Sequence, residues 1–93
     1  MIKSFSEKEA ERLFNRETSR KLPPDIQRIA RRKLELLNAA TTLNDLRFPP
    51  ANRLEKLRGD RKEMYSIRIN DQWRICFKWA DNNAFAVEIV DYH

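Results

Sequence analysis

The sequence predicts an α+β fold, with two to three N-terminal helices packed on one face of a small twisted, mainly antiparallel β-sheet. Two observations point to this class. Apolar residues in the first half of the chain recur near helical spacing, whereas after residue 64 they alternate with polar residues, as in strands. With 93 residues the chain supports a single core, so we predict one domain over residues 1–93.

The chain is predicted to open with a short strand and a short helix. MIKSF, residues 1–5, has an alternating pattern that suits a strand. Ser6 and Glu9 then have the spacing of a capping box, in which the serine side chain caps the helix. We therefore expect a helix over residues 9–17, EAERLFNRE.

The longest helix is predicted over residues 25–40, directly after the breaker KLPPD. Pro24 and Asp25 suit a first helical turn. The apolar stripe expected to face the core comprises Ile26, Ile29, Ala30, Leu34, Leu37 and Ala40. Off this stripe, Arg31 and Glu35 have the i,i+4 spacing of a surface ion pair.

A loop with two consecutive prolines and the only glycine, Gly59, separates the helices from the strands. We expect a short helical turn at 42–47 before it. Beyond it, YSIRIN (65–70) and WRICFKW (73–79) alternate with period two, and the intervening NDQ and DNN segments suit tight hairpins. Three antiparallel strands are therefore predicted within residues 64–93.

Strand parity makes a prediction about the end of the sequence. Under strict alternation through AFAVEIVDYH, one side carries Phe85, Val87, Ile89, Asp91 and His93. The other side carries Tyr92. The same alternation puts Arg68 and Arg74 on the face away from the aromatic core. For His93 to meet Arg74, the chain must bend near residue 91, or the site must lie around the strand end.

Positive charge is concentrated in the middle of the chain. Lys and Arg outnumber Asp and Glu by 19 to 14, giving a net charge of +5, and residues 46–78 carry nine bases against four acids. Such an excess favours nucleic acid as a partner, the alternative being a solvated face without a ligand.

Composition disfavours several classes of function. No apolar run approaches the roughly 20 residues of a membrane-spanning helix, and MIKSFSEKEAERLF lacks the apolar segment of a signal peptide. We therefore expect a cytoplasmic protein without membrane contact. Cys76 and His93 are the only residues of their types, too few for an ordinary zinc site, and glycine-rich phosphate-binding motifs are absent. Neither a metal nor a cofactor is expected.

The remaining residue types suit cleavage of an RNA phosphodiester by its own 2′-hydroxyl. That reaction needs a base, cations that stabilise the phosphorane, and an acid for the leaving oxygen. His93 can act as acid or base near neutral pH, Arg68 and Arg74 can hold the phosphate, and Tyr92 can stack on a base or donate a proton. The alternatives are an ordinary chain end for His93, surface strand positions for the arginines, and packing for Tyr92.

The segment SIRINDQWRICF, followed by a final DYH, resembles the HigB-type "killer" toxins of the RelE/ParE superfamily. MIKSF and PPANRLE also fit that family, so the resemblance covers nearly the whole chain. It implies a RelE-like fold and an endoribonuclease toxin of a type II toxin–antitoxin system, which needs no cofactor and cuts mRNA in the ribosomal A site. It also implies a helix-turn-helix antitoxin of the HigA type as partner, with DNA contacted only through that antitoxin.

By position, the resemblance assigns catalytic roles to Asp91, Tyr92, His93 and Arg74. It also places the basic residue of an LKGD-like loop on Arg58. Some relatives have a histidine where this sequence has Glu55. Either Glu55 or Asp91 is therefore expected to serve as base, or catalysis relies more on electrostatic clamping and on geometry supplied by the ribosome, with weak activity as the consequence. The RNA-binding or phosphate-binding set is predicted to be Arg53, Lys56, Arg58, Arg61, Arg68 and Lys78.

Two other functions are compatible with the same residues. ParE-like relatives inhibit DNA gyrase by binding, without nuclease activity. A plain RNA-binding module would bind RNA in a salt-dependent way without cleaving it. The DYH segment together with Arg74 favours the nuclease.

Overall fold

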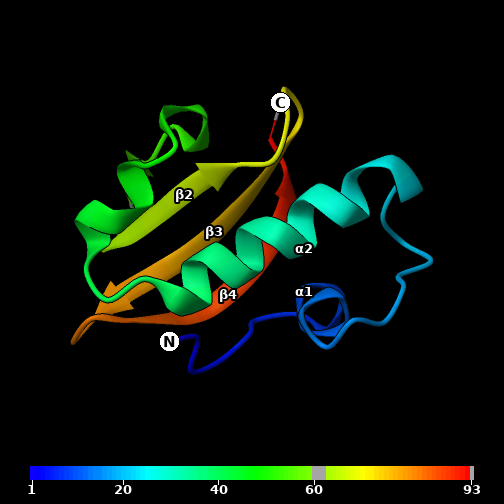
Figure 1. Cartoon of the computed structure of the whole chain (residues 1–93), viewed down its shortest axis with the longest axis horizontal. Coiled ribbons are helices and arrows are strands. Elements are labelled where there is room, and N and C mark those ends of the chain that lie inside the picture. The colour runs from blue at the N-terminus through cyan, green and yellow to red at the C-terminus, as the bar shows by residue number, and fades with distance from the viewer. Residues whose placement is uncertain (60–62, 93) are drawn as a thin grey trace.

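The computed structural model describes residues 1–59 and 63–92, which form two layers. Helices α1 (Lys8–Phe14) and α2 (Pro24–Ala39) lie on one face of a four-stranded sheet (Figure 1). The antiparallel strands follow the order β1 (Glu55–Lys56), β2 (Met64–Arg68), β3 (Trp73–Ala80) and β4 (Asn83–Asp91). The predicted α+β class, with helices on one face, is confirmed, and its α-helices number two in the part of the chain that the structure describes.

The cap of α1 differs from the prediction. Glu7, not Ser6, caps the helix, and its carboxylate accepts hydrogen bonds from two backbone N–H groups of the first turn at 2.8 and 3.0 Å. The same carboxylate accepts from the N–H of Ile89 at 3.1 Å, which ties α1 to β4. Ser6 cannot serve as the cap because its own N–H and hydroxyl bind β4, the hydroxyl donating to Glu88 at 3.0 Å.

The predicted pair between Arg31 and Glu35 on α2 is wrong. Arg31 reaches across to α1 and donates from Nε to the carbonyl of Leu13 at 3.0 Å. The Leu13 carbonyl also accepts from the backbone N–H of Arg16 at 3.0 Å, so this guanidinium adds a second hydrogen bond to it and joins the two helices. Glu35 accepts instead from Arg16 at 3.3 Å.

The core lies between the helices and the sheet. Its fully buried members include Leu13, Ile26, Leu34, Leu37, Ile67, Ile75, Phe77 and Val87. Ile29, which the helical spacing assigned to this core, is 38% exposed. At ~100° per residue it lies roughly 90° around α2 from the centre of the buried stripe, so its side chain leaves the core.

After α2 the chain forms two single-turn 3₁₀ helices, η1 (Leu43–Arg47) and η2 (Pro50–Asn52). The first agrees with the helical turn expected at 42–47. Its Asp45 carboxylate accepts from the backbone N–H groups of Thr41 and Thr42 at 3.0 and 3.1 Å, which lowers the pKa of Asp45 below its ordinary value.

The N-terminal residues run along the edge of β4. The predicted first strand is reduced to two isolated parallel bridges, which Ile2 and Phe5 make to Ala84 and Val87. Between them, the N–H of Ala86 donates to the Ser4 hydroxyl at 2.9 Å rather than to a backbone carbonyl, so the ladder is interrupted.

This interruption coincides with a β-bulge at Ala86. Two β4 residues, Ala86 and Val87, lie opposite Phe77 alone, and Ala86 has a φ of 52°. The strict alternation expected along this strand is therefore wrong here. Phe85 pairs with Lys78 on the face away from the helices, whereas Val87 is buried in the core. Alternation resumes beyond the bulge and sets the face of every later side chain.

Candidate active site

The centre of the candidate site is the Arg74 side chain of β3, on the sheet face away from the helices. Arg74 is only 7% exposed. Its Nε donates to the Ser66 hydroxyl at 2.8 Å, and one terminal nitrogen donates to the carbonyl of Arg53 at 2.6 Å. These acceptors are uncharged, so they fix the guanidinium in place without neutralising it.

Local structure explains why these two acceptors are available. Ser66 lies on the neighbouring strand β2, fully buried, and faces the same side of the sheet as Arg74. Arg53 caps the end of η2 in the left-handed backbone conformation, with φ 45°, so its carbonyl does not continue the helix. Arg74 thus joins β2, β3 and the segment that follows η2.

Tyr92 covers the remaining side of this cation. The Arg74 guanidinium carbon lies 5.6 Å from the centre of the Tyr92 ring, a cation–π distance. The bulge makes this possible, because Val90 pairs with Arg74 and Tyr92 follows two residues later on the same face. The tyrosine is 41% exposed, so part of it is accessible to a ligand.

This arrangement suits an anionic ligand. A fixed guanidinium in a partly desolvated position attracts a phosphate more strongly than one in bulk water. An exposed aromatic ring beside it offers a stacking surface for a nucleobase. Together they provide the two kinds of contact that a nucleotide makes.

Asp91 faces away from this cluster. It pairs with Trp73 across the sheet, and its carboxylate accepts from Nε2 of Gln72 at 3.1 Å. Side chains alternate between the two faces beyond the bulge, so Asp91 and Tyr92 lie on opposite faces, as the alternation predicted. His93, predicted as the general acid or base, lies outside the described residues.

The predicted RNA-binding residues fall into different places. Lys56 and Arg58 are exposed on the segment that begins at Arg53, close in sequence to the carbonyl that Arg74 binds. Lys78 is exposed four residues along β3 from Arg74, roughly 13 Å at ~3.3 Å per residue, and its Nζ lies 3.7 Å from a carboxylate oxygen of Glu63. The remaining member, Arg61, lies outside the described residues.

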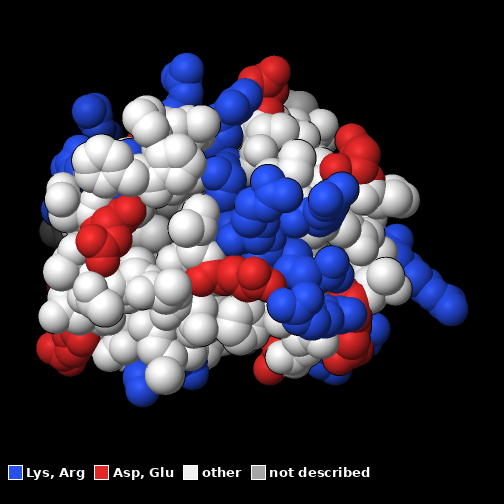
Figure 2. All heavy atoms as spheres, in the orientation of Figure 1, with Lys and Arg blue, Asp and Glu red and all other residues white. Residues whose placement is uncertain are grey.

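Arg68 is the cross-strand neighbour of Arg74. Although the two pair in register, Arg68 forms an ion pair with Asp71 and lines a hollow of about 450 Å³ with Arg32 and Lys33 of α2. We call this hollow the α2 groove; its other walls come from Ile29, Leu36, Pro49, Ala51 and Ile69. Figure 2 shows Lys and Arg side chains gathered across the middle of the face that carries α2.

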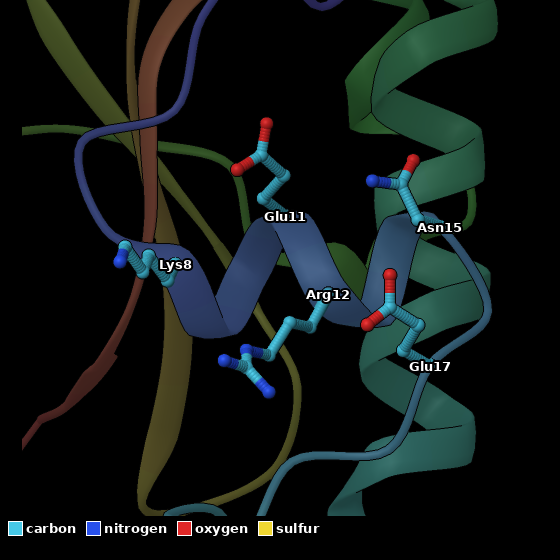
Figure 3. Close-up of a pocket in the computed structure, with 5 residues that line it drawn as sticks. All are labelled: Lys8, Glu11, Arg12, Asn15 and Glu17. Carbon is cyan, nitrogen blue, oxygen red and sulfur yellow. The ribbon is translucent and has the colours of Figure 1, made fainter.

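A further hollow, over α1, shows no comparable arrangement. It is lined by Lys8, Glu11, Arg12, Asn15 and Glu17, and has a volume of about 230 Å³. Figure 3 shows these side chains spread along the helix and the turn after it, with both signs of charge present.

Within residues 1–59 and 63–92, no group of three or more His, Cys, Asp or Glu could hold a metal ion. No helix in the same residues is long and apolar enough to cross a membrane.

Two partners of the site could not be found from the sequence. Ser66 lies on a predicted strand face, where an ordinary polar residue is expected. The Arg53 carbonyl belongs to the backbone, which carries no residue-specific signal. Arg74 was expected on the sheet face away from the core, so the sequence did not indicate that this arginine is buried and needs acceptors.

Known proteins match this chain in sequence over most of its length. The family described as "RelE-like toxin of type II toxin-antitoxin system HigB" matches residues 3–93. Toxin HigB-1 of Vibrio cholerae is 41% identical over 85 residues, which cover 90% of each chain. Endoribonuclease HigB of Proteus vulgaris is 34% identical over 94 residues, which cover the whole of both.

Solved structures share the fold at lower identity. The YoeB–YefM complex from Staphylococcus aureus superposes with a TM-score of 0.61 at 21% identity, covering 100% of this chain and 98% of the matched one. A YafQ mutant from E. coli gives a TM-score of 0.62 at 14% identity, covering 98% and 93%. These matches agree with the two-layer architecture.

Proposed function

Because the chain belongs to the HigB-like family of RelE-like toxins from type II toxin–antitoxin systems, we propose that it is an endoribonuclease that cuts mRNA in the ribosomal A site and stops translation. Endoribonuclease is the activity in the name of its relative from Proteus vulgaris. The proposal places the protein in the cytoplasm, with ribosome-bound mRNA as its substrate.

The observation that carries this proposal is the buried Arg74 guanidinium, held by uncharged oxygens beneath an exposed tyrosine. During attack of the 2′-hydroxyl, negative charge grows on the phosphate oxygens. A cation fixed in advance stabilises that charge without having to reorganise. Tyr92 positions the nucleotide by stacking, which holds the 2′-oxygen in line with the leaving 5′-oxygen.

Proton transfer is proposed for His93 and one carboxylate. His93 acts as acid or base, and Asp91 or Glu55 supplies the second group. The phosphate backbone on either side is proposed to contact the exposed cations Arg53, Lys56, Arg58 and Lys78, and Arg68 beside Arg74. Arg61 belongs to the same proposed set and lies outside the described residues.

The proposed partners follow from the same assignment. A helix-turn-helix antitoxin of the HigA type neutralises the toxin, and DNA is contacted only through that antitoxin. The YoeB–YefM structure is itself a complex of two proteins, and one of them has this fold.

The test is primer extension on a defined mRNA programmed into purified 70S ribosomes. Wild-type protein is compared with Tyr92→Ala and His93→Gln, and with Arg12→Ala as a control that removes an exposed cation far from Arg74. We expect ribosome-dependent cuts with the wild type and the control. We expect about 5- to 150-fold slower cutting with Tyr92→Ala, because loss of base stacking removes about 1–3 kcal/mol.

Absence of cutting by wild-type protein that still arrests growth would refute the nuclease. Labelling of new protein and new DNA after toxin expression then identifies the target. Replication stopping before translation would indicate gyrase inhibition instead.

A further inference from the structure

The α2 groove has an apolar floor and a cationic rim, both built largely by one face of α2. Ile29, Arg32, Lys33 and Leu36 have the spacing i, i+3, i+4 and i+7, so they form a single stripe on the helix. This stripe is separate from the one that faces the core. Pro49 supplies part of the opposite wall.

The apolar side chains of this region are unusually accessible. Ile29 is 38% exposed, and Phe48, which precedes Pro49, is 65% exposed. Single exposed apolar residues are common, but Ile29 lines a concave surface that also has apolar walls, and Phe48 is adjacent in sequence to Pro49 of that surface. A ligand that fills the groove would cover apolar surface that water now contacts.

The cations of the rim lie close together, and few carboxylates neutralise their charge. Partial burial lowers the pKa of Lys33, and the nearby charges of Arg32 and Arg68 lower it further. Lys33 donates to the amide oxygen of Asn52, a neutral acceptor. Among the described residues, no carboxylate forms an ion pair with Arg32 or Lys33, and the Asp71 partner of Arg68 is 98% exposed.

We infer that the α2 groove is the docking site for an acidic amphipathic segment of the antitoxin. Apolar side chains of the segment pack on Ile29 and Leu36, and its carboxylates pair with Arg32 and Lys33. A nucleic-acid backbone fits less well, because phosphates would satisfy the rim but leave the apolar floor uncovered. This inference rests on the proposed function, which supplies an antitoxin as partner.

The location has a functional corollary. The groove reaches the edge of the sheet beside Arg74. Its α2 residues lie on the helix side, but Arg68, which also lines it, pairs in register with Arg74. A segment docked in the groove would therefore lie next to the candidate active site.

The test measures binding of the full-length toxin to the purified cognate antitoxin by isothermal titration calorimetry. The groove variants are Arg32→Glu and Ile29→Asp. Arg20→Glu makes the same charge change on an exposed position outside α2 and outside the groove, and serves as the matched control. Thermal melts confirm that each variant is folded.

We expect each groove variant to raise the Kd at least tenfold, since each leaves a buried carboxylate or apolar group of the partner unpaired. The control should stay within about twofold. Unchanged affinity in both groove variants would overturn the docking site.

A second readout separates this inference from the proposed function. Growth arrest by each toxin variant is measured without antitoxin and then with it. Variants that still arrest growth but escape rescue support the groove as antitoxin site. Variants that lose toxicity while keeping antitoxin affinity would instead assign the groove to the ribosome, and a wild-type protein without toxicity would reject the proposed function itself.

Discussion

The Arg74 site and the α2 groove both hold positive charge beside apolar or aromatic surface, yet their cations differ in how they are supported. Arg74 is buried and has a hydroxyl and a carbonyl as fixed acceptors. Arg32 is exposed and has no such bonds among the residues described, and the pKa of its neighbour Lys33 is lowered. The fold itself holds the Arg74 guanidinium in place, whereas the cations of the α2 groove are stabilised only when a ligand brings negative charge.

The largest effect expected from this difference is on stability. Arg74→Ala should lower the free energy of unfolding by about 3 kcal/mol, because the Ser66 hydroxyl and the Arg53 carbonyl lose a charged donor. Arg32→Ala, which removes the same side chain from the groove, should change it by less than ~0.5 kcal/mol. Urea unfolding followed by circular dichroism measures both. Equal losses of free energy of unfolding would mean that the fold holds Arg32 as firmly as it holds Arg74.

A smaller effect is expected at the bulge that brings Tyr92 to Arg74. Ala86→Gly should stabilise the chain by about 0.5–1 kcal/mol, because glycine adopts the positive φ of this position without the steric cost that alanine has. Ala84→Gly, in the buried part of the same strand, is the control and should destabilise it. Differential scanning calorimetry checks the opposite signs. A destabilised Ala86→Gly would show that the alanine methyl group matters more than backbone strain.

The smallest effect concerns the titration of Lys33. Arg32→Gln should raise the pKa of Lys33 toward its ordinary value, since one of the positive charges that disfavour its protonation is gone. Burial is the larger cause and stays, so the return should be partial. NMR titration of the Lys33 side chain measures it, with Arg28→Gln as control. If the two variants gave the same Lys33 pKa, neighbouring charge would not contribute to the lowered value.

Much of this fold could be predicted because periodic patterns record which face of an element is buried. The α2 stripe and the alternation in β2 and β3 were sufficient for the helix and the hairpin. The two-residue strand β1 is too short to have a period. Ile29 was misassigned because spacing alone does not say how wide the buried stripe is.

The candidate site was predicted in part. Arg74 and Tyr92 were identified by type and by resemblance, and the structure brings them together. The groups that hold Arg74 were not predicted, because a backbone carbonyl such as that of Arg53 gives no residue-specific signal in the sequence. The cap at Glu7 was missed for a related reason, since Ser6 was already bound to β4, a contact between distant parts of the chain.

The bulge at Ala86 also sets where this chain can tolerate changes in length. Deletion of the one extra residue, Ala86, would leave a regular ladder with Val87 opposite Phe77, so every later side chain would keep its face. Deletion of a residue after the bulge, such as Glu88, would instead turn Tyr92 toward the helices and bring Asp91 to the Arg74 face. The hairpin turns at 70–72 and 81–82 have no such constraint, because added residues there extend a loop. In an alignment of related chains, gaps should therefore gather at those turns or at position 86, and be absent between positions 87 and 92.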